Sequence, residues 1–532
     1  MDEIDHTIPS NTLYVGISEL PNELLVEVFF RCIEVVTELA MSKAGDGYLL
    51  RPYSWLTITH VCRHWRQLSL QTSSMWANIT YFPKVGPRII GEMLVRAKHA
   101  PLAIRAIHSG HSDGTIPKHL KDLLCRLDRA RLADLDFPST YYGELDKIVP
   151  RHLPRLTTLR LNAHSGIVAF PKHLLTCSMP ALRELIMTSP EVQWQSPVFQ
   201  QLSLRKLVIR GATFEPVMLN AMRGLPNLKH LDLKGHFKIL DAPRTGRILR
   251  TVPPESQVML SQLEWVGLEG QLLQITGFLN HLQFPHTASI HLCSAGPPSS
   301  HDIPAVIPYI VKKFAQHTDP KSGTPMRSLA LWSNALFRFK EDNMSTATYV
   351  DFYTAVISVQ DEPICSPDGH QVPHLRLGVR YSPMKDFDVT ALLQELVLSL
   401  HIADIETAII SRLPPSDTIE PVYADLLGRM PKITALRIGG HPGPATYLIR
   451  LLYHVVEDTL ASSESDAVVP PRKSLLVPLL RTLHVHDTFF CGFYMGRDPR
   501  WTHEALIDAL EWRSEWGLGL TKVSPGRMYM EV

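Results

Sequence analysis

A short apolar pattern recurs along most of the chain and constrains its fold more than any other feature. The pattern is apolar-x-x-apolar-x-apolar, often preceded by proline, as in Pro154-Arg-Leu156-x-x-Leu159-x-Leu161. The alternation at its end indicates a short strand with one buried face. Copies begin at Leu132, Leu156, Leu182, Leu204, Leu228, Leu263, Thr287, Met326, Val372, Leu393, Ile433 and Leu480.

The spacing of the copies indicates a stacked array. The first copies begin at positions 132, 156, 182, 204 and 228, which are 24, 26, 22 and 24 residues apart. One such unit cannot bury its own apolar edge, so neighbouring units must stack on it. Proline is abundant, at 41 of 532 residues, and Pro154, Pro180 and Pro226 lie two residues before a first leucine. At these positions proline ends the segment that connects two strands, and the next strand begins directly after it.

In period and pattern, these copies resemble degenerate leucine-rich repeats. The family usually has Asn or Cys three residues after the last strand leucine, but this chain has other residues there, among them His164, Pro190 and Ala212. Five of the seven later spacings stretch to between 35 and 47 residues, which predicts insertions. The resemblance implies an α/β fold: an irregular leucine-rich-repeat-like solenoid over residues 131–500.

Two helical stretches precede the array. Pro21 suits the first position of a helix, and Glu23 complements its positive end. A polar interval and a second stretch follow, and Trp76 is expected to close a small bundle. Residues at three- and four-residue steps predict one apolar face on each helix. They are Leu24, Leu25, Val28, Phe29 and Ile33 on the first, and Val61, Cys62, Trp65 and Leu68 on the second.

These stretches resemble an F-box of the fungal type. The motif is Leu20-Pro21-x-Glu23-Leu24-Leu25-x-x-Val28-Phe29, then Val61-Cys62-Arg63-x-Trp65-Arg66-x-Leu68, then Met75-Trp76. The resemblance covers residues 13–82 and includes a longer interhelical segment near residues 37–54. It implies that apolar anchors dock a Skp-type adaptor, and through it a cullin. The residues it assigns to adaptor binding are Leu20, Pro21, Leu24, Leu25, Val28, Phe29, Val61, Cys62, Trp65, Leu68 and Trp76.

Charge and composition exclude several classes of partner. Lys and Arg number 53 and Asp and Glu number 52, giving a net charge of +1. That balance argues against a nucleic-acid partner and against a membrane partner. The N-terminal residues lack a secretory pattern, and the seven cysteines form no C-x-x-C pair. We therefore expect a reduced protein of the cytoplasm and/or nucleus.

No motif predicts catalysis. The sequence lacks G-x-S-x-G, G-x-x-x-x-G-K-[ST] and G-x-G-x-x-G. His484-Val-His486-Asp487 and the pair His60 and His64 do not have the spacing of zinc ligands. We therefore expect no catalytic residue, metal or cofactor, and a chain that is not an enzyme; a hydrolase with unrecognised motifs is a remote third possibility.

Two functions remain open. In the first, the chain is the substrate-recognition subunit of an SCF-type cullin–RING ubiquitin ligase, in which residues 13–82 hold the adaptor and the repeats hold a protein substrate of unknown identity. In the second, it is a leucine-rich-repeat scaffold without a ligase role, and the helices merely cap the array. Only the second predicts that deletion of residues 1–82 unfolds the repeats.

The repeat domain is expected to have irregular ends. Residues 83–130 would form a linker and a first irregular repeat, and residues 501–532 a C-terminal cap. Side chains that point outward between the strand leucines are the candidates for substrate contact, although most such charges simply face solvent. They are Arg160, Arg183, Arg205, Lys229, Asp232, Glu264, His291 and Arg437.

Overall fold

The computed structural model divides the chain into two compact units, Met1–Leu204 and Arg205–Val532. This division falls at none of the boundaries expected at residues 82, 130 and 500, which stay predictions. The described residues are 17, 20–42, 52–83, 85–108, 115–164, 172–189, 191–238, 252–253, 257–295, 306, 308–310, 313, 328–336, 345–353, 375–381, 402–411, 420–439, 448–449, 451–452, 455–457, 473–475, 477–486, 500–515, 520 and 522–525.

The first unit begins with a helical module. Its elements are α1 (Asn22–Ser42), the 3-10 helix η2 (Ser54–His60), α2 (Arg63–Gln71) and α3 (Ser73–Trp76). Pro21 precedes α1, and its carbonyl accepts the amides of Leu24 and Leu25 at 3.0 and 3.1 Å. The helix start predicted at Pro21 is thus confirmed to within one residue.

Both helices differ from the prediction at one end. The first was expected to stop near residue 37, but α1 continues to Ser42, because Ala40 is buried against Phe82 and Ile107. The second stretch is broken where Cys62 adopts an extended backbone, with φ −154° and ψ 172°. The Cys62 Sγ accepts the Trp65 amide at 3.4 Å and so begins α2.

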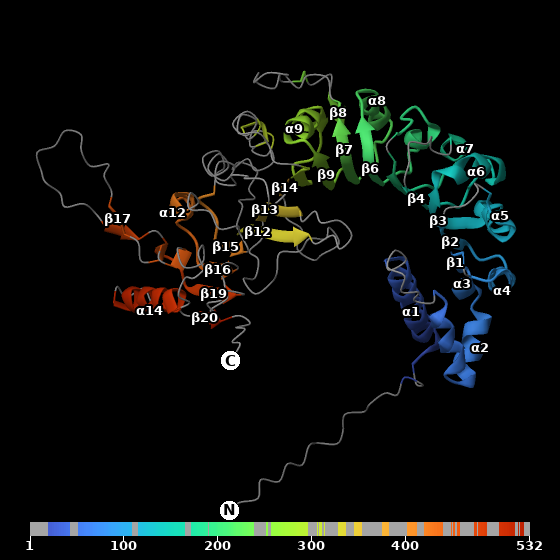
Figure 1. The fold of residues 1–532 in the computed structure, drawn as a ribbon, viewed down its shortest axis with the longest axis horizontal. Helices are drawn as coiled ribbons and strands as arrows, with labels where there is room; N and C mark the ends of the chain where they lie inside the picture. The colour runs from blue at the N-terminus through green and yellow to red at the C-terminus, as the bar shows by residue number, and fades with distance from the viewer. Residues whose placement is uncertain are drawn as a thin grey trace, which may run out of the picture. The chain divides into compact units, whose positions relative to one another are not determined.

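Five parallel strands follow the helices in the first unit, adjacent in chain order (Figure 1). They are β1 (Asn78–Tyr81), β2 (Leu102–Ile107), β3 (Ala130–Pro138), β4 (Thr158–His164) and β5 (Glu184–Thr188). The returns contain α4 (Pro87–Ala97), α5 (Lys118–Leu124), η3 (Leu127–Arg129), η4 (Ser139–Tyr141), α6 (Tyr142–Ile148), α7 (Lys172–Thr176) and η5 (Pro197–Gln200).

The second unit continues the same strand-and-return plan. Its first strands, β6 (Lys206–Phe214), β7 (His230–Phe237), β9 (Trp265–Gly270) and β11 (Ser289–Ser294), pair in parallel. The helices α8 (Val217–Arg223) and α9 (Leu272–Asn280) lie in the returns. Val258–Met259 (β8) and Leu282–Gln283 (β10) form a small separate sheet.

The middle of the second unit departs from an all-parallel plan. Strand β14 (Leu375–Tyr381) pairs with β11 in parallel, but β13 (Ser345–Tyr353) is antiparallel to β14 and to β12 (Ser328–Leu336). The sequence pattern predicts the strands near Met326 and Val372 but not β13, which occupies the stretched interval between them. Parallel pairing resumes through β15 (Thr407–Ser411), β16 (Ala435–Gly439), β19 (Thr482–His486) and β20 (Lys522–Pro525).

The apolar pattern forms the core, as predicted. All three positions are buried in the copies that begin at Leu156, Leu182, Leu204, Leu228, Leu263, Ile433 and Leu480. Two copies differ: Leu132 and Thr287 are not buried, whereas the apolar positions that follow them are. The copy at Leu393 lies outside the described residues, as do Met326 and Val372, the first residues of two other copies.

Near the C-terminus, the second unit contains α12 (Glu420–Gly428), the antiparallel pair β17 (Val455–Glu457) and β18 (Lys473–Leu475), and α14 (Arg500–Glu515). The helix α14 overlaps residues 501–532, which were expected to form a C-terminal cap. Its Arg513 is buried and donates hydrogen bonds to the carbonyls of Leu452, Val477 and Leu480 at 3.2–3.3 Å. These bonds join α14 to the ends of the neighbouring return segments.

Candidate functional site

Helix α1 has two apolar faces rather than the single face predicted from its spacing. Leu25, Phe29 and Ile33 are buried within the module. The Phe29 ring packs on the ring of Trp65 with centroids 4.9 Å apart. This inner face holds α1 against the other helices, as expected for core residues at four-residue steps.

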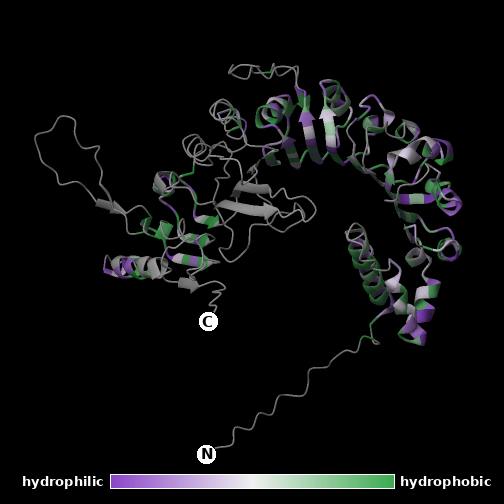
Figure 2. Ribbon diagram, in the orientation of Figure 1, coloured by the Kyte–Doolittle hydropathy of each residue, from purple (hydrophilic) through white to green (hydrophobic). Residues whose placement is uncertain are grey.

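The other apolar face of α1 is exposed. Leu24, Val28, Val35 and Leu39 follow one another at steps of four, seven and four residues, so they share one side of the helix. We call these four residues the outer stripe. Figure 2 shows α1 coloured hydrophobic over most of its length, although only one of its apolar faces is buried. An exposed row of this kind is typical of a surface that another protein covers.

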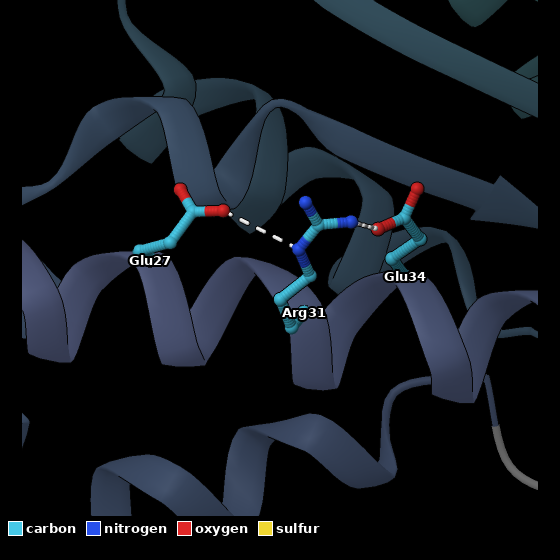
Figure 3. A network of polar contacts seen from close by, with 3 residues as sticks. All are labelled: Glu27, Arg31 and Glu34. Atoms are coloured by element: carbon cyan, nitrogen blue, oxygen red, sulfur yellow. Dashed lines mark hydrogen bonds and ion pairs between the residues drawn. The ribbon is translucent and has the colours of Figure 1, made fainter.

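A charged row borders the outer stripe. Arg31 pairs with Glu27 at 3.3 Å and with Glu34 at 3.0 Å along the helix (Figure 3). All three side chains are well exposed, so each pair stabilises α1 by only a few tenths of a kcal/mol. The row forms a polar rim beside the apolar stripe, the usual anatomy of an interface.

The segment between η2 and α2 adds further exposed apolar surface. Val61 and Cys62 are exposed where the second helical stretch breaks, and Leu70 is exposed at the end of α2. Trp65 and Leu68 are half-buried, with part of each side chain at the surface. Leu20 is half-buried and Pro21 exposed just before α1.

The structure separates the predicted adaptor-binding residues into two groups. Leu25, Phe29 and Trp76 lie in the interior of the free chain, where they pack the helices together, and their contact with an adaptor stays a prediction. The Trp76 indole donates to the Ser69 carbonyl at 2.8 Å and packs edge-on against Trp55. Those at least partly at the surface are Leu20, Pro21, Leu24, Val28, Val61, Cys62, Trp65 and Leu68, and their contact with an adaptor stays a prediction.

The sequence motif missed two surface residues and one internal one. Val35 and Leu39 extend the outer stripe beyond the motif, and the continued helical spacing after Val28 was the available signal. Tyr53 is the internal residue. Its hydroxyl donates to the Thr80 carbonyl at 2.6 Å and accepts the Thr80 amide at 3.0 Å, and burial raises the pKa of the hydroxyl.

Because Thr80 belongs to β1, the first strand of the sheet, Tyr53 satisfies polar backbone at the sheet edge. An open strand edge is a template for aggregation unless it is covered. The helical module therefore has a structural role as well as an exposed face: its interior side closes the edge of the strands.

Four of the candidates for substrate contact form ion pairs. Arg160 lies 3.8 Å from Asp134 across β4 and β3, and Asp232 of β7 lies 3.9 Å from Arg210. Lys229 and Glu264, which directly precede β7 and β9, lie 2.5 Å apart. Burial raises the pKa of Asp134 although two arginines oppose the shift. The candidate Arg437 is buried, so its backbone position on β16 does not place it at a contact surface.

Among the described residues, no group of histidine, cysteine, aspartate and glutamate side chains has the arrangement of a metal site. Asp487 of the motif at His484 lies outside the described residues. No described helix is both long and apolar enough to span a lipid bilayer.

Comparison with known families identifies the helical module. Residues 17–81 match the model of the F-box-like family, which covers α1, η2, α2, α3 and β1. The chain thus carries an F-box-like domain, a class of module that generally binds Skp-type adaptors. A search of the curated proteins finds no match for the chain.

Proposed function

We propose that this chain is the substrate-recognition subunit of an SCF-type cullin–RING ubiquitin ligase. The observation that carries the proposal is the F-box-like match at residues 17–81, joined to an exposed apolar surface on the same residues. The module would bind a Skp-type adaptor and through it a cullin. The strands that follow would form an irregular leucine-rich-repeat-like domain, as in F-box proteins of the fungal type, and hold a protein substrate.

The proposal assigns no catalysis to the chain. Its contribution is proximity, because a receptor raises the effective concentration of a substrate lysine near the activated ubiquitin. A protein with this role would be located in the cytoplasm and/or nucleus. The alternative, a leucine-rich-repeat scaffold without a ligase role, has no use for an adaptor and predicts no complex with one.

The test is a binding measurement between the full chain and a purified Skp-type adaptor. We expect a stable complex, and we expect Leu24→Asp plus Val28→Asp to weaken it by about 30-fold or more, since each substitution places a charge in a desolvated contact. Both residues are exposed in the free chain, so the variant should still fold.

The matched control is Val95→Asp. Val95 is an exposed valine of α4 in the same unit but outside the F-box-like residues, so its variant should bind the adaptor normally. Absence of a complex with the wild-type chain would favour the scaffold. Equal loss in the control and the double variant would show that the outer stripe is not the contact.

A further inference from the structure

A second candidate surface lies on the strands of the second unit. In β6, β7, β9 and β11, alternate residues such as Leu231 and Leu233 are buried, and α9 lies against β7, β9 and β11, with its Phe278 packed on Phe237. Most residues between them face the other way and are half-buried or exposed, whereas Val208 and Gly267 are buried. We call this second side the β6–β11 face. In Figure 2 these strands alternate between hydrophobic and hydrophilic colours.

Two cations stand in register on this face. Arg210 of β6 is paired with Lys234 of β7 on adjacent parallel strands. Like charges directly opposite each other on neighbouring strands destabilise a sheet. The two opposed cations therefore do not stabilise the fold. A role in binding explains their position better than a role in folding.

Carboxylates beneath the cations reduce this repulsion. Arg210 lies 3.9 Å from Asp232, and Lys234 lies 2.8 Å from Glu269. The cations are the more exposed partners: Arg210 is 58% exposed against 26% for Asp232, and Lys234 is 37% exposed against 15% for Glu269. The face therefore presents positive groups to a partner, although the whole chain is nearly neutral.

An aromatic stack lies beside the cations. The Trp265 ring stacks on His230 with centroids 4.1 Å apart and planes 5° apart, and His291 contacts its other side at 4.9 Å. Gly267 makes room for it, since a Cβ there would come within 2.1 Å of the indole. The Trp265 Nε1 is buried and has no hydrogen-bond partner among the described residues, so the ring contributes its aromatic surface rather than a donor to this face.

We propose that the β6–β11 face docks an acidic segment of a partner protein. The exposed polar groups of Arg210 and Lys234 are donors, which complement side-chain carboxylates and backbone carbonyls. The partly exposed carboxylates of Asp232 and Glu269 beside them disfavour the dense phosphates of a nucleic acid. If the chain is a ligase receptor as proposed above, this acidic segment belongs to its substrate, so that identification rests on the proposed function.

The test is fluorescence anisotropy with the full chain and a labelled peptide in which Glu and Gly alternate. A peptide with Gln in place of Glu is the reference. We expect the Glu peptide to bind at least about 10-fold more tightly, with an affinity that falls as salt rises. Arg210→Gln plus Lys234→Gln should remove at least about 10-fold of that binding.

A matched control removes the same net charge from another place. Lys432→Gln plus Arg429→Gln eliminates two ion-paired cations of the second unit that lie outside β6, β7, β9 and β11, and it should leave peptide binding unchanged. Thermal unfolding of each variant verifies that it is folded.

Three results would overturn the proposal. One is equal binding of the Glu and Gln peptides, or no binding, up to about 1 mM. Another is equal loss in the control and face variants, which would mean that only net charge matters. The third is tighter binding of a single-stranded oligonucleotide than of the Glu peptide. Adaptor binding, measured on the same variants, should stay normal, so failure of this proposal and failure of the ligase role are distinguishable.

Discussion

At the scale of single residues, Tyr53 shows how a side chain can join two structural elements. Its hydroxyl makes both an accepting and a donating hydrogen bond to Thr80, so it satisfies backbone of β1. Sequence patterns could not predict this, because the tyrosine lies 27 residues from its partner, and short apolar motifs carry no information on such contacts.

We predict that Tyr53→Phe lowers the free energy of unfolding by about 1–3 kcal/mol, since it leaves buried backbone groups of Thr80 without their partner. Urea denaturation measures the loss. Tyr423→Phe is the control: the Tyr423 hydroxyl is buried and has no hydrogen-bond partner among the described residues, so its removal should cost nothing or stabilise the chain. Equal losses in the two variants would refute the role of Tyr53.

At the scale of elements, α1 shows what periodicity predicts and what it leaves open. The proline and the acidic first turn correctly placed the helix start. The spacing of Leu24, Leu25, Val28 and Phe29 predicted an amphipathic helix, but two apolar rows lie side by side. Which row is buried depends on the residues that pack against α1, among them Trp65 and Phe82. Because both lie far from α1 in the sequence, the spacing within α1 cannot show which row they cover.

Adjacent leucines on α1 provide a matched pair for this distinction. Leu25 is fully buried and Leu24 is exposed. We expect Leu25→Ala to lower the free energy of unfolding by about 2–5 kcal/mol and Leu24→Ala to change it by less than about 0.5 kcal/mol. Thermal or urea unfolding of the two variants measures these changes. Similar losses of unfolding free energy in both variants would mean that the buried and exposed faces of α1 are assigned wrongly.

The strands show the same division between local and distant information. Leucine spacing was sufficient to locate β4, β5, β7 and β16, because burial of alternate residues is a local requirement of a one-sided strand. It did not reveal β13, whose antiparallel pairing with β12 and β14 depends on contacts across a long interval. The cation pair of Arg210 and Lys234 was likewise invisible until the register of β6 and β7 was known.

At the scale of the whole molecule, the helical module and the first strands form one folding unit. The F-box-like match ends at residue 81, which is also the last residue of β1, and Ala40 of α1 packs on Phe82 and Ile107. Deletion of residues 1–82 would therefore remove an edge strand under either proposed function. That deletion cannot distinguish a ligase receptor from a scaffold, contrary to the expectation from sequence.

The most direct test of the account is hydrogen exchange of the full chain with and without a purified Skp-type adaptor. A bound partner slows the opening of every segment that unfolds together with its docking surface. We predict slower exchange in residues 22–42 and 61–71, extending into β1 and β2, with β6 unchanged. Unchanged exchange in residues 22–42 at saturating adaptor, or protection confined to the second unit, would contradict the account.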